Sequence, residues 1–326
     1  MSSSQIALGV SSCLLGEAVR YDGGHRHDHY ITDTLGKYFR FVPVCPEVGS
    51  GMPIPREPMR LEGDPEQPRL MTIKSRVDLT EQMESFCWEK VEALEREELC
   101  GFIFKKDSPS SGLYRVKVYT SVPAKDGISK SHVTVHKGRG LFADAVCKRF
   151  PFLPVEEDSR LHDPIHRENF IERVFTYSRW KAFLRAEPTL GDLVEFHAAH
   201  KLLIMAHSPT LYRELGALVG KGAELPEGEL FLRYGELLMM AMSMCATVKK
   251  HTDVLMHIMG YFKSVLTREE KEELLDLIRK YHNHLVPHIV PVTMLRHYCL
   301  KFENTYLSRQ LYLSPVPEEL ALRNHA

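Results

Sequence analysis

The sequence predicts an α/β domain with a mostly parallel sheet, followed by an all-α helical domain. The chain has 326 residues, which exceeds the usual size of a single domain. Short apolar runs alternate with helical segments in the first half, and this alternation is typical of a parallel sheet covered by helices. The second half has helical periodicity almost to its end. We therefore expect two domains of different class.

Three apolar runs in the first half predict buried strands. They cover residues 5–10, 39–44 and 101–104 and are rich in β-branched or aromatic side chains. Between the second and third runs, residues 79–99 carry apolar side chains at spacings of three and four, which predicts an amphipathic helix. These side chains are Met83, Phe86, Cys87, Val91 and Leu94.

Residues 149–164 have the composition of a connection between domains. They carry three prolines among acidic residues and show no sustained periodicity. We place the boundary near residue 158, so the predicted domains cover residues 1–158 and 159–326.

The second domain contains clear helix start signals. Ser208 and Pro209 form an N-cap and first-turn pair, and Thr267 with Glu270 forms a capping box. The predicted helices cover residues 165–186, 190–206, 209–219, 229–266, 267–285 and 292–311. We expect the fourth to break near Lys249 or Gly260, because a helix of that length is uncommon.

The composition fits a soluble globular protein, with 44% hydrophobic and 26% charged residues. Seven scattered cysteines suit a reducing compartment. Residues 1–6 do not resemble a signal peptide. The longest apolar stretch, 237–248, is shorter than the roughly 20 residues that cross a bilayer. We therefore expect a cytoplasmic protein without a membrane partner.

The net charge of −1 and the pI near 7.0 give no support to a nucleic-acid partner at the level of the whole chain. One local segment, 115–149, is basic, and Lys137 and Arg139 are its candidate RNA contacts. Its charged residues are Arg115, Lys117, Lys125, Lys130, Lys137, Arg139, Lys148 and Arg149 against Asp126 and Asp144. The alternative is a scattered solvated surface. The Gly-Arg-Gly sequence at 138–140 could admit a phosphate, although so short a motif is weak.

A chemically unusual loop follows each predicted strand. The loops cover residues 11–16, 45–49 and 108–112 and contain Cys13, Cys45 and a run of serines. Ligands of open α/β sheets gather outside the carboxyl ends of the strands. We therefore expect these loops to converge on one site.

The three loops resemble the motifs of the thiouracil desulfidase family called TudS. The matching stretches are SCLLG at 12–16 with RYDG at 20–23, VCPE at 44–47 with PIPR at 53–56, and GFIFK at 101–105 with SPS at 108–110. The helical half is similar to the YbgA-type domain of the RudS branch. Its matching stretches are EFHAAHK at 195–201, MAHSP at 205–209 and GYFK at 260–263.

This resemblance implies a 4Fe-4S cluster held by three cysteines, with one iron open to the sulfur of the substrate. The first two family cysteines fall on Cys13 and Cys45, and the third falls on Ser111, where the family has cysteine. Because cluster irons prefer soft thiolates, Ser111 should weaken the cluster or abolish it. Cys100 lies at the far end of its strand, too distant to replace Ser111.

The resemblance also implies acid-base roles for Glu47 and Ser108 in a hydrolysis that needs no electron donor. A carboxylate beside a cluster can deliver water and a proton in sequence. The implied substrate is 4-thiouridine in tRNA. One alternative is free thiouracil, and another is an inactive nucleic-acid-binding accessory protein.

Five further residues are candidate substrate or RNA contacts. Arg20, Tyr21 and Lys105 belong to the matching motifs, whereas Arg56 and Arg60 follow the Cys45 loop and could meet a substrate phosphate.

The remaining cysteines and the histidine groups have ordinary interpretations. Four cysteines fall in helical runs, and we interpret them as core residues: Cys87, Cys147, Cys245 and Cys299. His25, His27 and His29 fit a solvated loop, because a metal site would need an extended segment and a further ligand. His197, His200 and His207 share one helical face, which fits either helix packing or contact with RNA or phosphate.

Overall fold

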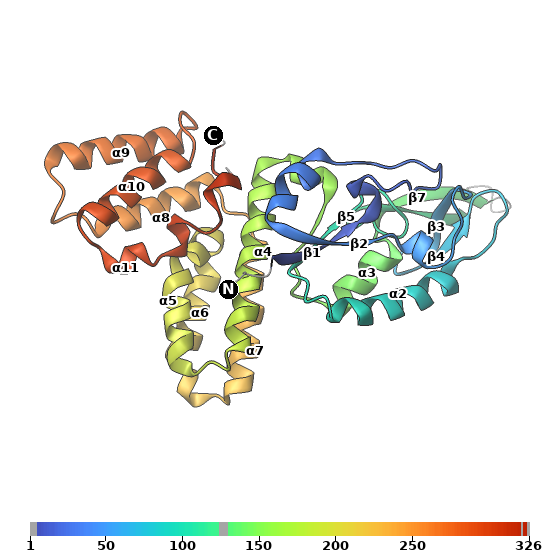
Figure 1. Cartoon of the computed structure of the whole chain (residues 1–326), viewed down its shortest axis with the longest axis horizontal. Helices are drawn as coiled ribbons and strands as arrows, with labels where there is room; N and C mark the ends of the chain where they lie inside the picture. The colour runs from blue at the N-terminus through green and yellow to red at the C-terminus, as the bar shows by residue number, and fades with distance from the viewer. Residues whose placement is uncertain (1–4, 124–129, 321, 325–326) are drawn as a thin grey trace. The chain divides into compact units, whose positions relative to one another are not determined.

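The computed structural model describes residues 5–123, 130–320 and 322–324. The chain forms two compact units, Met1–His162 and Asp163–Ala326. The first is α/β and the second is helical, as predicted (Figure 1). None of the described helices is long and apolar enough to cross a membrane.

The first unit is built on a parallel sheet with the strand order β2-β1-β5-β8. These strands are β2 (Phe39–Val44), β1 (Ile6–Ser11), β5 (Gly101–Phe104) and β8 (Val155–Glu157), and every pair is parallel. The three predicted strands are confirmed. The segment 149–164, interpreted as a connection, contains the division between the two units and also supplies the edge strand β8, which is too short to show periodicity.

Helices α2 (Thr80–Glu95) and α3 (Leu141–Arg149) pack against each other in this unit. Phe142 of α3 contacts Phe102 and Phe104 of β5 edge to face, with ring centroids 5.8 Å and 6.3 Å apart. The predicted helix at 79–99 is confirmed over most of its length. It buries Met83, Cys87, Val91 and Leu94 as expected, whereas Phe86 is only partly covered.

A second sheet, with the strand order β4-β3-β6-β7, was not predicted. Its strands are β3 (Met59–Asp64), β4 (Gln67–Thr72), β6 (Val116–Pro123) and β7 (Lys130–Gly138). All pairs are antiparallel except β3 with β6. The basic segment 115–149 therefore folds as a hairpin followed by α3. Lys125 and Asp126 lie outside the described residues, as does the side chain of Lys130.

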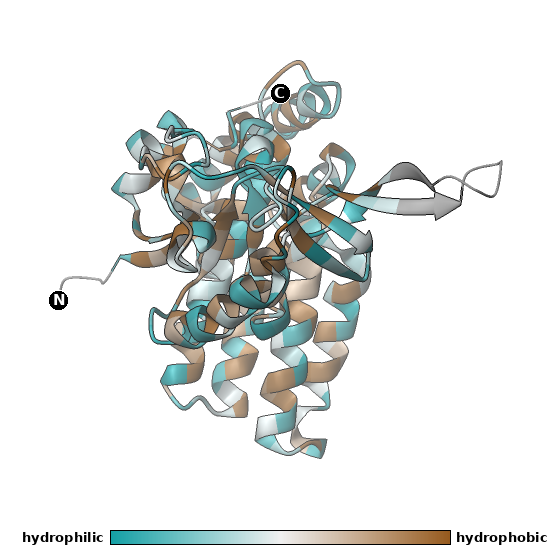
Figure 2. Ribbon diagram, turned by 90° about the vertical axis from the view of Figure 1, so that its right-hand side faces the viewer, coloured by the Kyte–Doolittle hydropathy of each residue, from teal (hydrophilic) through white to brown (hydrophobic). Residues whose placement is uncertain are grey.

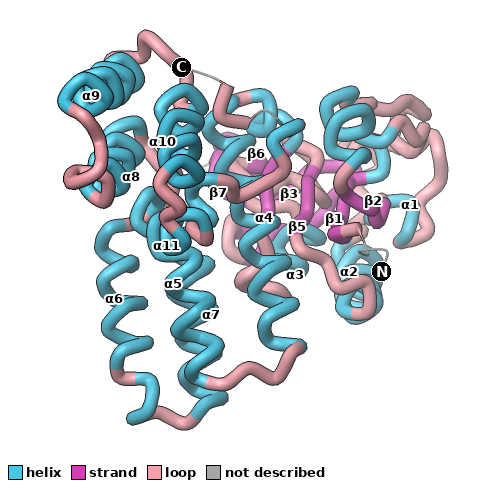
Figure 3. The backbone as a smooth tube through the Cα atoms, turned by 60° about the vertical axis from the view of Figure 1, so that its left-hand side comes forward, coloured by secondary structure: helices cyan, strands magenta, loops and turns pink. Residues whose placement is uncertain are grey.

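The second unit consists of helices, whose chain path Figure 3 shows. They are α4 (Pro164–Arg185), α5 (Leu190–His207), α6 (Pro209–Gly220), α7 (Glu227–Ser243), α8 (Val248–Gly260), α9 (Arg268–His282), α10 (Ile289–Lys301) and α11 (Thr305–Ser308). The Ser208 cap and the Thr267 capping box are both present. The segment 229–266, predicted as one long helix, is divided: α7 ends at Ser243 and α8 ends at Gly260. The last predicted helix ends at Lys301.

Apolar residues recur along these helices (Figure 2), and many of their side chains are buried. Trp180 of α4, Phe196 of α5 and Tyr234 of α7 form an aromatic cluster, with Trp180 within 5.4 Å of both other ring centroids.

A buried ion cluster ties the C-terminal segment to α4. Arg323 is 2.9 Å from Glu172 and 3.3 Å from Glu168, and it also donates to the carbonyl of Tyr312. Glu172 accepts a second hydrogen bond from His207 at 3.0 Å. Although burial opposes both charges, the Arg323 charge lowers the pKa of Glu172 to about 2, and the Glu172 charge raises the pKa of Arg323. Both groups are therefore charged at neutral pH.

We predict that Arg323→Met destabilises the helical unit by about 3–5 kcal/mol, because it leaves buried carboxylates without their cation. The matched control is Arg268→Met, which removes an exposed ion pair with Glu272 and should cost about 0.5 kcal/mol or less. The measurement is urea unfolding followed by Trp180 fluorescence in a Trp88→Phe background. Equal stability of the two variants would contradict the assigned role of Arg323.

Candidate functional site

Four parallel strands of the first unit end at one cavity of about 920 Å³. Ser11 ends β1 and Cys13 follows it, Cys45 follows β2, Lys105 follows β5, and Asp158 follows β8; all line the cavity. The carboxyl ends of parallel strands meet at one edge of a sheet, which explains why segments distant in sequence converge here.

The structure brings Cys13, Cys45 and Ser111 to this cavity. Cys13 lies in a short helical turn after β1, and Cys45 is the N-cap of the four-residue helix α1 (Pro46–Gly49). Ser111 is buried in the loop after β5. All three side chains therefore line the same space from different strand ends.

Glu47 lies at the centre of a hydrogen-bond network in the cavity. Its carboxylate accepts from Ser110 at 2.5 Å, from Ser108 at 3.3 Å and from the Cys45 thiol at 3.3 Å. Arg56 lies 3.9 Å from the same carboxylate, and both side chains are largely buried. Glu47 therefore joins the second loop to the third.

The third loop is shaped by its backbone. The Ser108 hydroxyl accepts from the amides of Ser110 and Ser111 at 3.3 Å and 3.1 Å. Glu157 at the end of β8 accepts from the amides of Leu113 and Tyr114 at 2.9 Å and 3.0 Å. These bonds fix the position of residue 111 without using its own side chain.

The glycines of the Gly-Arg-Gly sequence have a packing role. A Cβ atom on Gly140 would lie 2.4 Å from the carbonyl carbon of Ser110, and one on Gly138 would lie 2.6 Å from a methyl group of Val118. Both distances are too short for any side chain. The glycines thus allow the base of the hairpin to support the third loop, which explains them without a phosphate.

Burial raises the pKa of both thiols, and the nearby Glu47 charge raises it further. The pKa of Cys13 rises to about 11 and that of Cys45 to about 12. In the metal-free protein both thiols are therefore protonated at neutral pH, so binding of a metal must displace their protons.

Four of the candidate substrate residues line the cavity, namely Arg20, Tyr21, Arg56 and Lys105. Arg56 donates to the carbonyl of Val19 at 3.0 Å, and Lys105 pairs with Asp158 at 2.8 Å.

The other three candidates are not among the residues that line the cavity. Arg60 pairs with Glu62 at 2.6 Å and covers the ring of Tyr119 at 4.4 Å instead of lining the cavity. Lys137 is exposed on β7, and Arg139 lies 3.6 Å from Asp144. Their positions on the hairpin and after it are compatible only with a contact outside the cavity.

Sequence reasoning missed Ser110, Asp158 and Glu157. Ser110 lies within the recognised SPS motif, so its hydroxyl could have been considered beside that of Ser108. Asp158 binds both the side chain of Lys105 and the amide of Lys106, each at 2.8 Å. Because β8 was not recognised, the sequence offered no signal for the two acidic residues at its end.

The first histidine group partly converges at the rim of the cavity. His27 and His29 line it, and donor atoms of His27, His29 and Asp33 lie within 4.8 Å of one another. Asp33 is the further ligand that a metal site would need, but all three side chains are exposed and His25 is not part of the group.

The second histidine group belongs to the helical interior. His197 bonds the hydroxyl of Tyr234 at 3.1 Å, and His200 bonds the carbonyl of Phe196 at 2.7 Å. Burial lowers the pKa of His197 to about 4 and that of His200 to about 3. Both rings are neutral at physiological pH, so the geometry favours helix packing over phosphate contact.

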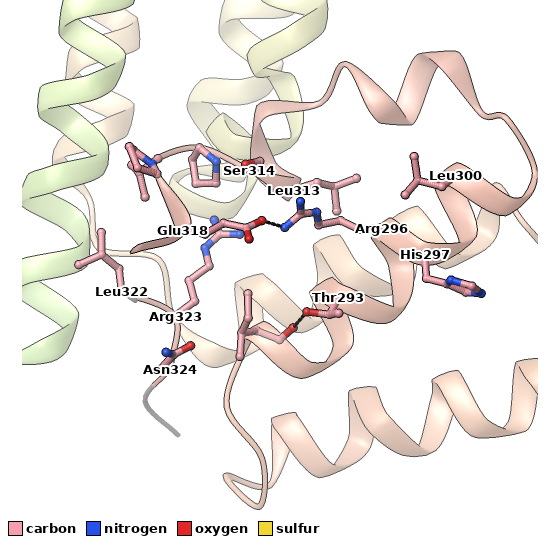
Figure 4. A pocket seen from close by; sticks show the side chains of 14 residues that line it. Thr293, Arg296, His297, Leu300, Leu313, Ser314, Glu318, Leu322, Arg323 and Asn324 are labelled. Carbon is pink, nitrogen blue, oxygen red and sulfur yellow. Dashed lines mark hydrogen bonds and ion pairs between the residues drawn. The ribbon is translucent and has the colours of Figure 1, made fainter. Parts of the chain in front are cut away.

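The helical unit contains a second cavity, of about 520 Å³, between α10 and the C-terminal segment (Figure 4). Leu300, Leu313 and Leu322 contribute apolar surface, and Arg296 forms an ion pair with Glu318 across it. This mixed lining contains no cysteine, in contrast to the cavity of the first unit.

The donors of the first cavity fit an iron-sulfur cluster in number. Two thiols and one hydroxyl line one cavity at three strand ends. The fit is weaker in chemistry, because the Ser111 oxygen is a harder donor than sulfur.

The chain matches two family models. The model described as 2-thiouracil desulfurase matches residues 8–158. The model described as a protein of unknown function, DUF1722, matches residues 201–317.

Two individual proteins are also similar to the chain. The uncharacterized protein YbgA of Escherichia coli (strain K12) is 31% identical over 137 residues, which cover 42% of this chain and 81% of that protein. A solved structure of a 4Fe-4S-dependent thiouracil desulfidase, TudS, is 24% identical with a TM-score of 0.38, covering 49% of this chain and 95% of that one.

We predict that Cys13 and Cys45 of the metal-free protein react slowly with iodoacetamide at pH 8, because only the thiolate attacks and both pKa values are raised. The alkylation rate should increase until the pH approaches about 11 at Cys13 and about 12 at Cys45. Mass spectrometry of the alkylated peptides measures each site separately, and a short cysteine peptide is the control. A rate that levels off near pH 8.5, the ordinary range of a free cysteine, would contradict the prediction.

Proposed function

Because the chain belongs to the two-domain TudS-type family, in which a 2-thiouracil desulfurase domain precedes a YbgA-type domain, we propose that it removes sulfur from thiolated uracil. The proposed substrate is 4-thiouridine in tRNA, and the products are uridine and sulfide. The observation that carries the proposal is the Glu47 carboxylate, held by Ser108 and Ser110 beside two thiols at the ends of parallel strands.

Cys13 and Cys45, with Ser111 in the third position, are the residues that would hold a 4Fe-4S cluster. When bound, the cluster supplies an open iron that accepts the sulfur of the substrate. The remaining chemistry is a balanced hydrolysis. Water adds to the ring carbon, the carbon-sulfur bond breaks, and sulfur leaves as sulfide while the carbon keeps its oxidation state.

Glu47 is the proposed acid-base residue. Its carboxylate can take a proton from water directed at the ring carbon and return that proton to the departing sulfur or a ring nitrogen. Ser108 and Ser110 donate to one oxygen of Glu47, and the Cys45 thiol of the metal-free protein donates to the other. These contacts hold the carboxylate in one orientation, and Arg56 lies 3.9 Å from it.

The size and charge of the cavity support a nucleotide as substrate. A volume of about 920 Å³ lies at the upper end of the range for small-molecule sites. Five cationic residues line it against four acidic ones, together with three histidines; the cations are Arg20, Arg26, Arg56, Lys105 and Lys106. This small positive excess suits one phosphate, so affinity for a whole tRNA must come from other surfaces.

Two rival functions remain distinguishable. Free thiouracil would need only the cavity, whereas an accessory protein without catalysis would bind RNA but release no sulfide. The serine at position 111 is the observation that favours the accessory role, because the weak third ligand reduces cluster retention.

We predict that Ser111→Cys increases both the iron and sulfide content per chain and the rate of sulfide release. Glu47→Gln in the Ser111→Cys background should keep the cluster but reduce turnover by about 10²–10⁴-fold, the usual contribution of a general acid-base. Anaerobic iron and sulfide determination and a sulfide-release assay measure the two effects. Cys87→Ala, in a helix of the same unit, is the control that should change neither.

If the unaltered chain retained a full cluster and turned over as fast as Ser111→Cys, residue 111 would not be a ligand. If Glu47→Gln remained fully active, another group would have to transfer the proton.

We further predict that the chain binds tRNA with an affinity that decreases steeply as salt increases, because phosphate contacts release counterions. Lys137→Ala and Arg139→Ala should each lower the slope of log affinity against log salt by about 1. Filter binding with tRNA that contains 4-thiouridine measures the effect, and Lys280→Ala on α9 is a control outside the basic segment. If the chain did not bind tRNA at low salt but turned over free thiouracil, free thiouracil would be the substrate in place of tRNA.

A further inference from the structure

Two imidazoles and a carboxylate form a buried cluster in the helical unit that the proposed reaction does not use. Glu168 comes from α4, His251 from α8, and His288 is the N-cap of α10. The three residues are only 8%, 6% and 3% exposed. One donor atom of each lies within 4.8 Å of the others.

These donors match a divalent transition metal. Zinc binds imidazole nitrogen and carboxylate oxygen at about 2.0–2.2 Å, so two donors on one ion are separated by about 4 Å at most. A shift of under about 1 Å would therefore bring the three donors onto one ion. Imidazoles make calcium or magnesium a poor choice, because those ions prefer ligands that are all oxygen.

The surroundings supply the support that metal-binding imidazoles need. The buried Tyr312 hydroxyl bonds Nδ1 of His251 at 3.1 Å and Nε2 of His288 at 2.9 Å. A hydrogen bond at the second ring nitrogen fixes the orientation of a metal-bound histidine. Tyr281 stacks on His288, with ring centroids 5.0 Å apart, and limits its rotation further.

The local charge also favours a cation. Glu168 and Glu172 share the single guanidinium of Arg323, at 3.3 Å and 2.9 Å. Burial and the neighbouring Glu172 charge raise the pKa of Glu168 to about 8, so one guanidinium does not keep both carboxyl groups charged at neutral pH. A metal ion that displaces the proton of Glu168 would supply a second cation.

We propose that Glu168, His251 and His288 bind a divalent transition-metal ion, with zinc as the best match. The ion would join α4 and α8 to the start of α10. Because all three donors are buried, the site holds helices together and does not expose the metal to a substrate. The competing explanation is a hydrogen-bond network that contains no metal.

The test uses the full chain with Cys13→Ser, Cys45→Ser, His27→Ala and His29→Ala, which removes the candidate donors of the first unit. After treatment with a chelator, this parent protein is titrated with cobalt(II) chloride and then with zinc sulfate. We expect one cobalt ion per chain, ligand-field bands of nitrogen and oxygen ligation without a thiolate charge-transfer band, and displacement of cobalt by zinc.

His251→Gln and His288→Gln should each weaken zinc binding by more than about 100-fold, and Tyr312→Phe by about 10-fold. The matched control is His257→Gln, a histidine on α8 outside the cluster, which should leave affinity unchanged. Circular dichroism checks folding. If the cluster variants do not fold, X-ray absorption at the zinc edge of the parent identifies the ligands, and histidine scattering without sulfur supports the site.

The proposal is overturned if the parent binds neither metal, if the zinc has sulfur neighbours, or if folded His251→Gln and His288→Gln bind zinc as tightly as the parent. None of these results depends on desulfidase activity, so the outcome is independent of the proposed function.

Discussion

The parallel direction of β2, β1, β5 and β8 is the constraint on which the site depends. It places four carboxyl ends at one edge, so Cys13, Cys45 and Ser111 meet although almost 100 residues separate the first from the last. Glu47 then joins the second loop to the third through Ser108 and Ser110. An antiparallel β5 would move the third loop to the opposite edge and leave Glu47 without these donors.

The elements that sequence reasoning identified are those with a strong local signal. Strands 39–44 and 101–104 are short apolar runs, and they agree with the observed bounds of β2 and β5. The capping boxes at Thr189 and Thr267 are likewise local, although only the second was recognised from the sequence. Convergence of the loops followed from a rule about parallel sheets, and the cavity agrees with it.

The parts that were missed depend on contacts distant in sequence. The second sheet carries many polar residues because one side of several strands is exposed, as the mixed burial of β3 and β4 indicates. Arg60 was assigned to the cavity because it is close in sequence to Arg56, but β3 directs it to Glu62 and Tyr119. The cluster of Glu168, His251 and His288 joins three helices, so no local pattern could reveal it.

The backbone support of residue 111 also has an evolutionary consequence. Ser108, Glu157 and the close approach of Gly140 determine the shape of the third loop, whereas the Ser111 hydroxyl makes only a 3.5 Å contact with Ser110. Exchange of oxygen for sulfur at this position therefore requires little rearrangement of the fold. At this proposed third ligand position, a lineage can lose or regain a thiolate in a single mutational step, and selection can act on the proposed cofactor site separately from selection on folding.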